Sequence, residues 1–158
     1  MLIIDAQEQP ITQISEDTEL LIEDLFHECQ YFPEDTDETM TFTAGGTPNV
    51  FGAWAEIVDN NGVTFSSKFV AMNGHIDSIL VENTSAKDEV YVFEIAYGVS
   101  TKVIIDRGRI KSASVLVGTT QNSGKKSVLI TEGQTIFYRM KCETGGATWT
   151  GSFRYHAH

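Results

Sequence analysis

The stretch HIDSILVENTSAKDEVYVFEIAYG, residues 75–98, decides the fold. It holds two runs rich in β-branched and aromatic residues, 76–81 and 90–97, with the polar segment 83–88 between them. Such runs are typical of β-strands and the polar break predicts a turn, so we expect an antiparallel pair. The second run is apolar on both faces, which is typical of a strand in the middle of a β-sandwich.

On either side of this stretch the sequence predicts one short strand after another. The predicted strands are 39–43, 51–58, 63–70, 101–106, 112–117, 127–131, 134–142 and 147–156. The pair Asn61-Gly62 predicts a hairpin between the second and third of them. Apolar and polar residues alternate along the last two, which indicates strands with one buried face. Many short strands separated by turns predict an all-β fold, a jelly-roll-like β-sandwich.

The N-terminal part of the chain predicts a different structure. Ser15 precedes acidic residues and can cap a helix, and apolar residues then recur near helical spacing until Pro33. The apolar positions of this stripe are Leu21, Ile22, Leu25, Phe26, Cys29 and Phe32. We therefore expect one short helix near residues 16–32. It lies within an acidic arm, residues 1–43, that precedes a β-sandwich domain, residues 44–158.

Charge is divided unevenly along the 158 residues, whose formal net charge is −11. Residues 1–67 hold 14 Asp or Glu and no Lys or Arg, whereas residues 68–158 hold 8 acidic and 11 basic residues. The negative total argues against a nucleic-acid binder, because a phosphate backbone needs a basic surface. No apolar run is long enough to cross a membrane, and the N-terminus lacks the basic start of a signal peptide, so we expect synthesis in the cytoplasm.

The acidic arm is the predicted partner-binding surface. Its charges would steer the arm to a basic groove, and its apolar stripe would add affinity through buried area. The residues expected to make this contact are Glu16, Asp17, Leu21, Ile22, Glu23, Asp24, Leu25 and Phe26. The same helix could instead pack on its own sandwich, and the sequence leaves both possibilities open.

Few residues point to chemistry. His156 and His158 share one face of the last predicted strand and could hold a metal, above all if several copies met at this end. Asp77 lies two residues from His75, but no nucleophile accompanies them in the sequence, so a structural hydrogen bond or a surface pair is expected. Cys29 and the other cysteine, Cys142, form no motif and are expected to be structural thiols. We expect no catalytic residues, no metal and no cofactor.

The two tryptophans have different contexts. Trp149 shares its face with Phe153 and Tyr155, which predicts a core position. Trp54 alternates with Gly52 and Glu56, and core packing is favoured over a platform for a sugar ring.

Four segments resemble small β-rich virion proteins of tailed phages. They are NVFGAWAEIV at residues 49–58, EIAYG at 94–98, TEGQ at 131–134 and GSFRYH at 151–156. The resemblance covers about residues 42–158 and is greatest to capsid decoration (cement) proteins. It implies a non-enzymatic jelly-roll homotrimer on the capsid surface of the virion, bound to the lattice of the major capsid protein through its N-terminal segment. Two alternatives remain: a tail or fibre module that binds a receptor or glycan, and a metal-dependent jelly-roll enzyme.

Overall fold

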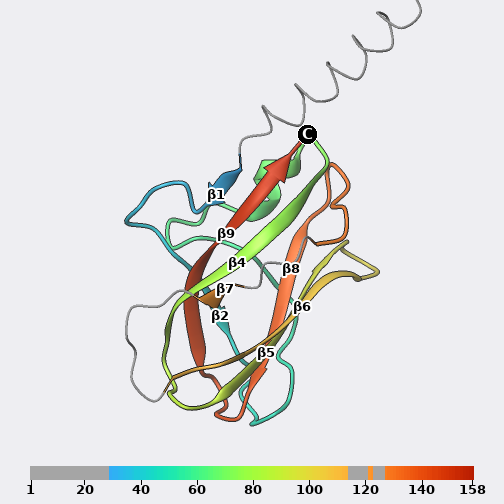
Figure 1. Cartoon of the computed structure of the whole chain (residues 1–158). Coiled ribbons are helices and arrows are strands. Elements are labelled where there is room, and N and C mark those ends of the chain that lie inside the picture. The colour runs from blue at the N-terminus through green and yellow to red at the C-terminus, as the bar shows by residue number, and fades with distance from the viewer. Residues whose placement is uncertain (1–28, 114–120, 123–126) are drawn as a thin grey trace, which may run out of the picture.

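The computed structural model describes residues 29–113, 121–122 and 127–158, which form two antiparallel sheets packed face to face (Figure 1). The first sheet has the order β1-β9-β4-β7, with β2 also paired to β9, and the second has the order β3-β8-β5-β6. The elements are β1 (Gln30–Phe32), β2 (Met40–Thr43), β3 (Ala55–Glu56), the 3-10 helix η1 (Phe65–Phe69), β4 (Gly74–Thr84), β5 (Val90–Tyr97), β6 (Val103–Lys111), β7 (Gln121–Asn122), β8 (Ile136–Cys142) and β9 (Thr148–Ala157). The predicted all-β sandwich is confirmed.

The strand order is that of a jelly roll. β1 and β2 both pair with β9, β1 opposite residues 153–155 and β2 opposite residues 148–151, so together they act as one interrupted first strand. Counted in this way, the first sheet contains the first, eighth, third and sixth strands, and the second contains the second, seventh, fourth and fifth. This alternation between two sheets defines the double Greek key of jelly rolls.

The predicted pairing of the strands in residues 75–98 is wrong. β4 pairs with β9 and β7 in the first sheet, and β5 pairs with β6 and β8 in the second. The segment between them therefore crosses from one sheet to the other. Tyr91 holds this corner, because its hydroxyl accepts a hydrogen bond from Ala86 N and donates one to Ala86 O, both at 2.9 Å. The interior position expected for the second run is confirmed, since β5 lies between β6 and β8.

Aromatic side chains fill the space between the sheets. Phe42 stacks on Tyr138 with ring centroids 3.9 Å apart and lies 4.2 Å from the ring of Trp149. Trp149 is fully buried, as the sequence predicts. The inward faces predicted for the last two strands are also confirmed: Ile136, Tyr138, Met140, Cys142, Ala147, Trp149, Phe153 and Tyr155 are all buried. Burial of these apolar surfaces is the main stabilising contribution to the sandwich.

The segments on either side of Asn61-Gly62 are less regular than predicted. Only Ala55–Glu56 of the first is a strand, and residues 65–69 of the second form η1. Phe65 and Phe69 are buried, whereas Ser67, which would share their face in a strand, is exposed. This burial pattern suits a helical turn better than a strand. The ring centroid of Phe65 lies 5.1 Å from that of Phe32 and 4.9 Å from that of Phe153.

The start of the described chain also differs from prediction. Residues 30–32, the expected end of the helix near 16–32, form β1, and Phe32 is buried between the sheets. Residues 30–43, assigned to the arm from sequence, thus contribute β1 and the correctly predicted β2 to the sandwich. The rest of the predicted helix, 16–28, lies outside the described residues.

The strand that follows β5 is longer than the predicted strand 101–106. β6 spans the predicted break between 101–106 and 112–117, and residues 114–117 lie outside the described chain. The predicted strand at 127–131 is reduced to a bridge between Ile130 and Gly74. Among the described residues, no helix has the length and apolar character needed to span a membrane.

Candidate functional site

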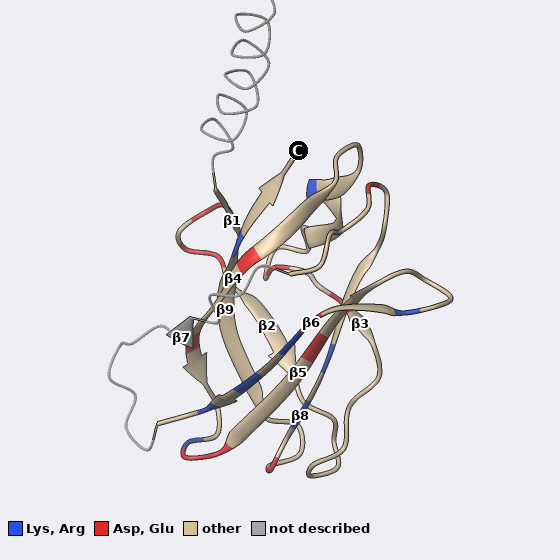
Figure 2. Ribbon diagram, turned by 45° about the vertical axis from the view of Figure 1, so that its right-hand side comes forward, with Lys and Arg blue, Asp and Glu red and all other residues tan. Residues whose placement is uncertain are grey.

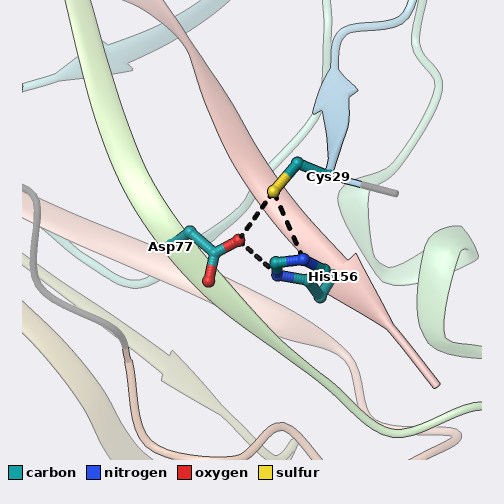
Figure 3. A group of neighbouring side chains, drawn as sticks. All are labelled: Cys29, Asp77 and His156. Carbon is teal, nitrogen blue, oxygen red and sulfur yellow. Dashed lines mark hydrogen bonds and ion pairs between the residues drawn. The ribbon is translucent and has the colours of Figure 1, made fainter. Parts of the chain in front are cut away.

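A thiol, an imidazole and a carboxylate meet at one end of the first sheet (Figure 3). The register of the sheet brings them together. Gln30 pairs with Tyr155, so Cys29, one residue before β1, lies beside the position of His156 in β9. On the other side of β9, His156 is paired with His75 of β4, close to Asp77. Three chain segments that are distant in sequence therefore converge on one imidazole.

A β-bulge directs the carboxylate. Ile76 pairs with Tyr155 and Ser78 pairs with Arg154, so Asp77 is an extra residue in β4 without a partner in the β9 register. A bulge bends its strand and turns a side chain away from the regular alternation. Here the carboxylate of Asp77 reaches His156, as Figure 3 shows.

The contacts are short and follow a defined order. Cys29 Sγ lies 3.2 Å from Nε2 of His156 and 3.7 Å from Oδ2 of Asp77. The other ring nitrogen, Nδ1, forms an ion pair with the same Oδ2. The side chains of Asp77 and His156 retain 12% and 24% exposure and Cys29 is exposed, so the cluster opens to solvent at the thiol. These three groups are all ligands of transition metals. A thiol next to an imidazole that is oriented by a carboxylate is also the arrangement of a nucleophile with its general base.

Two cavities on the described surface are lined by residues other than those of the cluster. A cavity of about 290 Å³ on the described surface is lined by Tyr31, Pro33, Glu34, Asp35, Thr36, Glu38, Glu82 and Ser152. A second, of about 220 Å³, is lined by Val90, Arg109, Ile110 and Lys111. Neither includes the thiol or the imidazole.

His156 and His158, the histidine pair that the sequence suggests as metal ligands, contact different residues. His156 contacts Asp77, whereas the ring of His158 lies 5.5 Å from that of His75. His75 Nδ1 is 3.3 Å from the carbonyl oxygen of Ser127. The contact that the structure gives Asp77 here is an ion pair with His156, whereas the sequence predicts His75 as its partner.

The outer face of the second sheet is basic. Its β6 and β8 carry lysines and arginines on either side of an acidic position in β5 (Figure 2). We call this surface the basic face; it comprises Arg107, Arg109, Lys111, Arg139 and Lys141. The alternation of Arg107, Arg109 and Lys111 along one strand could have been found in the sequence, but the predicted break after residue 106 concealed it.

Glu94 organises the basic face. Its carboxylate is buried and accepts hydrogen bonds from Nε of Arg107 at 2.9 Å and Nε of Arg139 at 2.7 Å. The guanidinium of Arg139 also lies 4.7 Å from the ring centroids of both Phe51 and Trp54. Trp54 is therefore half-buried beneath an arginine, so the predicted core position is wrong. Cation–π contacts of this kind hold the aromatic rings against the sheet.

Burial raises the pKa of several side chains in the core. Burial in the core, helped by the nearby charge of Glu34, raises the pKa of Tyr155 to about 12. Burial also raises the pKa of the Cys142 thiol, which keeps the thiol protonated. Its Sγ lies 3.1 Å from Oε2 of Glu89 and donates a hydrogen bond to it. The expected structural thiol is confirmed for Cys142, whereas Cys29 is exposed and lies in the cluster. The two cysteines are not disulfide-bonded.

The predicted partner-binding residues lie between positions 16 and 26, outside the described residues. Their predicted role stays a prediction. No protein-family model matches the chain, and no curated protein sequence matches it significantly.

Proposed function

We propose that this chain is a non-enzymatic structural protein of a tailed-phage virion, a decoration protein that binds the capsid shell as a homotrimer. The observation that carries the proposal is the separation of charge. Residues 1–28 contain eight Asp or Glu and no Lys or Arg, and they lead into a sandwich whose second sheet presents the basic face. Opposite charges on the two parts suit attachment in a repeating assembly. There, residues 1–28 of one copy, which we call the leader, can bind a neighbouring copy or a shell subunit.

The fold supports the same proposal. Jelly rolls are used by viral capsid and lectin domains, in which the sandwich acts as a rigid body and its edges and loops bind. A trimer would attach to a lattice through three leaders at once, which raises avidity without any new contact. Because it would bind only the assembled shell, it would stabilise that state by mass action.

Truncation tests the proposal, and the structure sets where to cut. Removal of residues 1–28 leaves β1 and β2 in place, whereas removal of residues 1–43 would take two strands from the first sheet. We expect the 1–28 deletion to remain folded by circular dichroism and to lose co-sedimentation with shells assembled from the major capsid protein of the same virus. Equal sedimentation of the truncated and full-length proteins would overturn the proposal.

Point variants separate charge from apolar contact in the leader. Neutralising Glu16, Asp17, Glu23 and Asp24 to the corresponding amides should weaken shell binding most at low salt, because screening removes the same attraction in the wild type. Replacing Leu21 and Leu25 by serine should weaken binding at every salt concentration, since buried apolar area is lost.

A tail or fibre module that binds a glycan is the second candidate. It is favoured by the aromatic pair Phe51 and Trp54, which are only half-buried on the basic face beside Arg139. A sugar ring would stack on the ring face that Arg139 leaves open. Binding on a glycan array that is lost in Trp54→Ala, with shell binding absent, would favour this candidate over decoration.

A further inference from the structure

We propose that Cys29 and His156 bind a zinc ion, with Asp77 positioning the imidazole. The donor atoms of the three residues lie within 4.8 Å of one another. The inference goes beyond the proposed function and stands without it, because it rests on the geometry of the free protein.

The spacing of the two direct ligands fits zinc. Zinc binds thiolate sulfur at about 2.3 Å and imidazole nitrogen at about 2.0 Å, so two such ligands of a tetrahedral ion lie about 3.5 Å apart. Sγ of Cys29 and Nε2 of His156 are 3.2 Å apart. A small rotation of the exposed cysteine side chain is enough to admit the ion. Thiolate and imidazole together favour zinc over magnesium or calcium, which prefer oxygen ligands.

Asp77 occupies the place of an orienting carboxylate. It contacts Nδ1 of His156, whereas the other ring nitrogen, Nε2, faces the thiol of Cys29. A carboxylate on the second nitrogen of a metal-bound histidine fixes the tautomer, holds the ring and raises the basicity of the ligating nitrogen. The β-bulge that directs Asp77 is thereby explained as a feature of the site and not as an irregularity of the sheet.

Among the described residues the site has two direct ligands, which leaves the outer coordination positions of the ion to water or to other groups. Because Cys29 is exposed, these positions face solvent. We therefore expect weaker binding than at structural zinc sites with four protein ligands. The bound ion would fasten Cys29, next to the acidic residues 1–28, to the ends of β4 and β9.

Cobalt(II) substitution tests the site directly. The full-length protein, purified without a histidine tag and kept reduced, would be titrated with Co²⁺ and monitored for the thiolate-to-cobalt charge-transfer band. We expect a band with a stoichiometry of one ion per chain, displaced by Zn²⁺. It should be absent in Cys29→Ser and His156→Asn. In Asp77→Asn, binding should be about 10- to 100-fold weaker, the usual effect of losing an orienting carboxylate.

Two control variants match the ligands. Cys142→Ser removes the other thiol, which is buried, and His158→Asn removes the other imidazole near the end of β9. Both should retain the band. Absence of the band in the wild type, or its loss in either control with retention in Cys29→Ser, would overturn the proposal.

A measurement on the wild type alone covers the case in which a variant does not fold. Zn²⁺ should slow alkylation of Cys29 by iodoacetamide, followed by mass spectrometry of the Cys29 peptide, and a chelator should restore the rate. Alkylation at the same rate with and without Zn²⁺ would contradict zinc binding and leave the cluster as a base-assisted thiol. Because no capsid is present in these experiments, their failure is distinct from failure of the decoration proposal.

Discussion

The two sheets of the sandwich use charged side chains in opposite ways. On the second sheet, buried Glu94 is shared by Arg107 and Arg139, and aromatic rings pack against Arg139. At the end of the first sheet, Asp77 and His156 pair next to an exposed thiol, and the group opens to solvent. The first arrangement satisfies its charges within the fold, whereas the second leaves donor atoms accessible to a ligand.

This difference teaches where stability and function lie in the molecule. Removing a member of the satisfied network leaves partners without their hydrogen bonds and should destabilise the fold. Removing a member of the open cluster should cost little stability and should change binding instead. We therefore expect larger losses of stability from substitutions in the packed second sheet than from substitutions in the open cluster.

The largest effect is expected at Gly108 in the second sheet. A Cβ at this position would lie 1.9 Å from Cζ of Phe93, which is fully buried. Phe93 would have to move out of its packed position, so Gly108→Ala should lower the free energy of unfolding by about 3 kcal/mol. Gly46→Ala is the matched control, because a Cβ there meets nothing within 4 Å. Equal urea midpoints for the two variants would show that the second sheet tolerates repacking.

Glu94→Ala should have the next largest effect. The substitution leaves Arg107 and Arg139 without their shared carboxylate, and we expect a loss of about 2 kcal/mol, reduced by the exposure of Arg107. Glu82→Ala, at an exposed position in β4, serves as the control and should change stability by no more than about 0.5 kcal/mol. Urea denaturation of both variants measures the difference. A loss at Glu94 no larger than at Glu82 would remove the contrast between the sheets.

Acid should weaken the second sheet through Glu89. Hydrogen bonds from the Thr144 hydroxyl and the Cys142 thiol lower the pKa of Glu89 below its ordinary value of 4.5. The unfolded chain therefore binds this proton more readily, so the contribution of Glu89 is present above pH 4.5 and is lost as the pH falls through the lower folded value. Glu89→Gln should lose less stability than the wild type between pH 6 and pH 3 in urea titrations. The same slope in both proteins would contradict this role.

The smallest effect is expected at Asp77. In protein treated with a chelator, Asp77→Asn should lower the free energy of unfolding by about 1 kcal/mol or less, because the ion pair is partly solvated. The difference should increase when Zn²⁺ is added, since the ion stabilises the wild type more than the weaker-binding variant. Thermal unfolding with and without Zn²⁺ measures both quantities. A large loss in the metal-free protein would place Asp77 among structural residues.

The fold class could be predicted from sequence because burial alternates along the strands. Met140, Cys142 and Phe153 face the core where the pattern places them. Strand pairing could not be predicted from sequence, because the polar turn between β4 and β5 has the same composition whether it closes a hairpin or crosses between sheets. The true partner of β4 is β9, some 70 residues further along the chain, and no local signal encodes that contact.

The candidate site was largely hidden for the same reason. The sequence pairs Asp77 with His75 and His156 with His158. Their contact depends on the β4–β9 register and a bulge that shifts it by one residue. The sequence places Cys29 in a helical stripe, because its spacing from Leu25 and Phe32 is helical, whereas the structure places it just before a strand. Spacing within one segment cannot reveal a cluster built from three.

The central position of β9 has a consequence for how the protein forms in the cell. β1, β2 and β4 all hydrogen-bond to β9, so the first sheet cannot assemble until residues 148–157 have left the ribosome. Aromatic residues such as Phe32 and Phe42 are synthesised more than 100 residues earlier and remain without their sheet partner until β9 has been made. Nascent chains should therefore depend on holding chaperones, and truncations that end before β9 should accumulate in inclusion bodies.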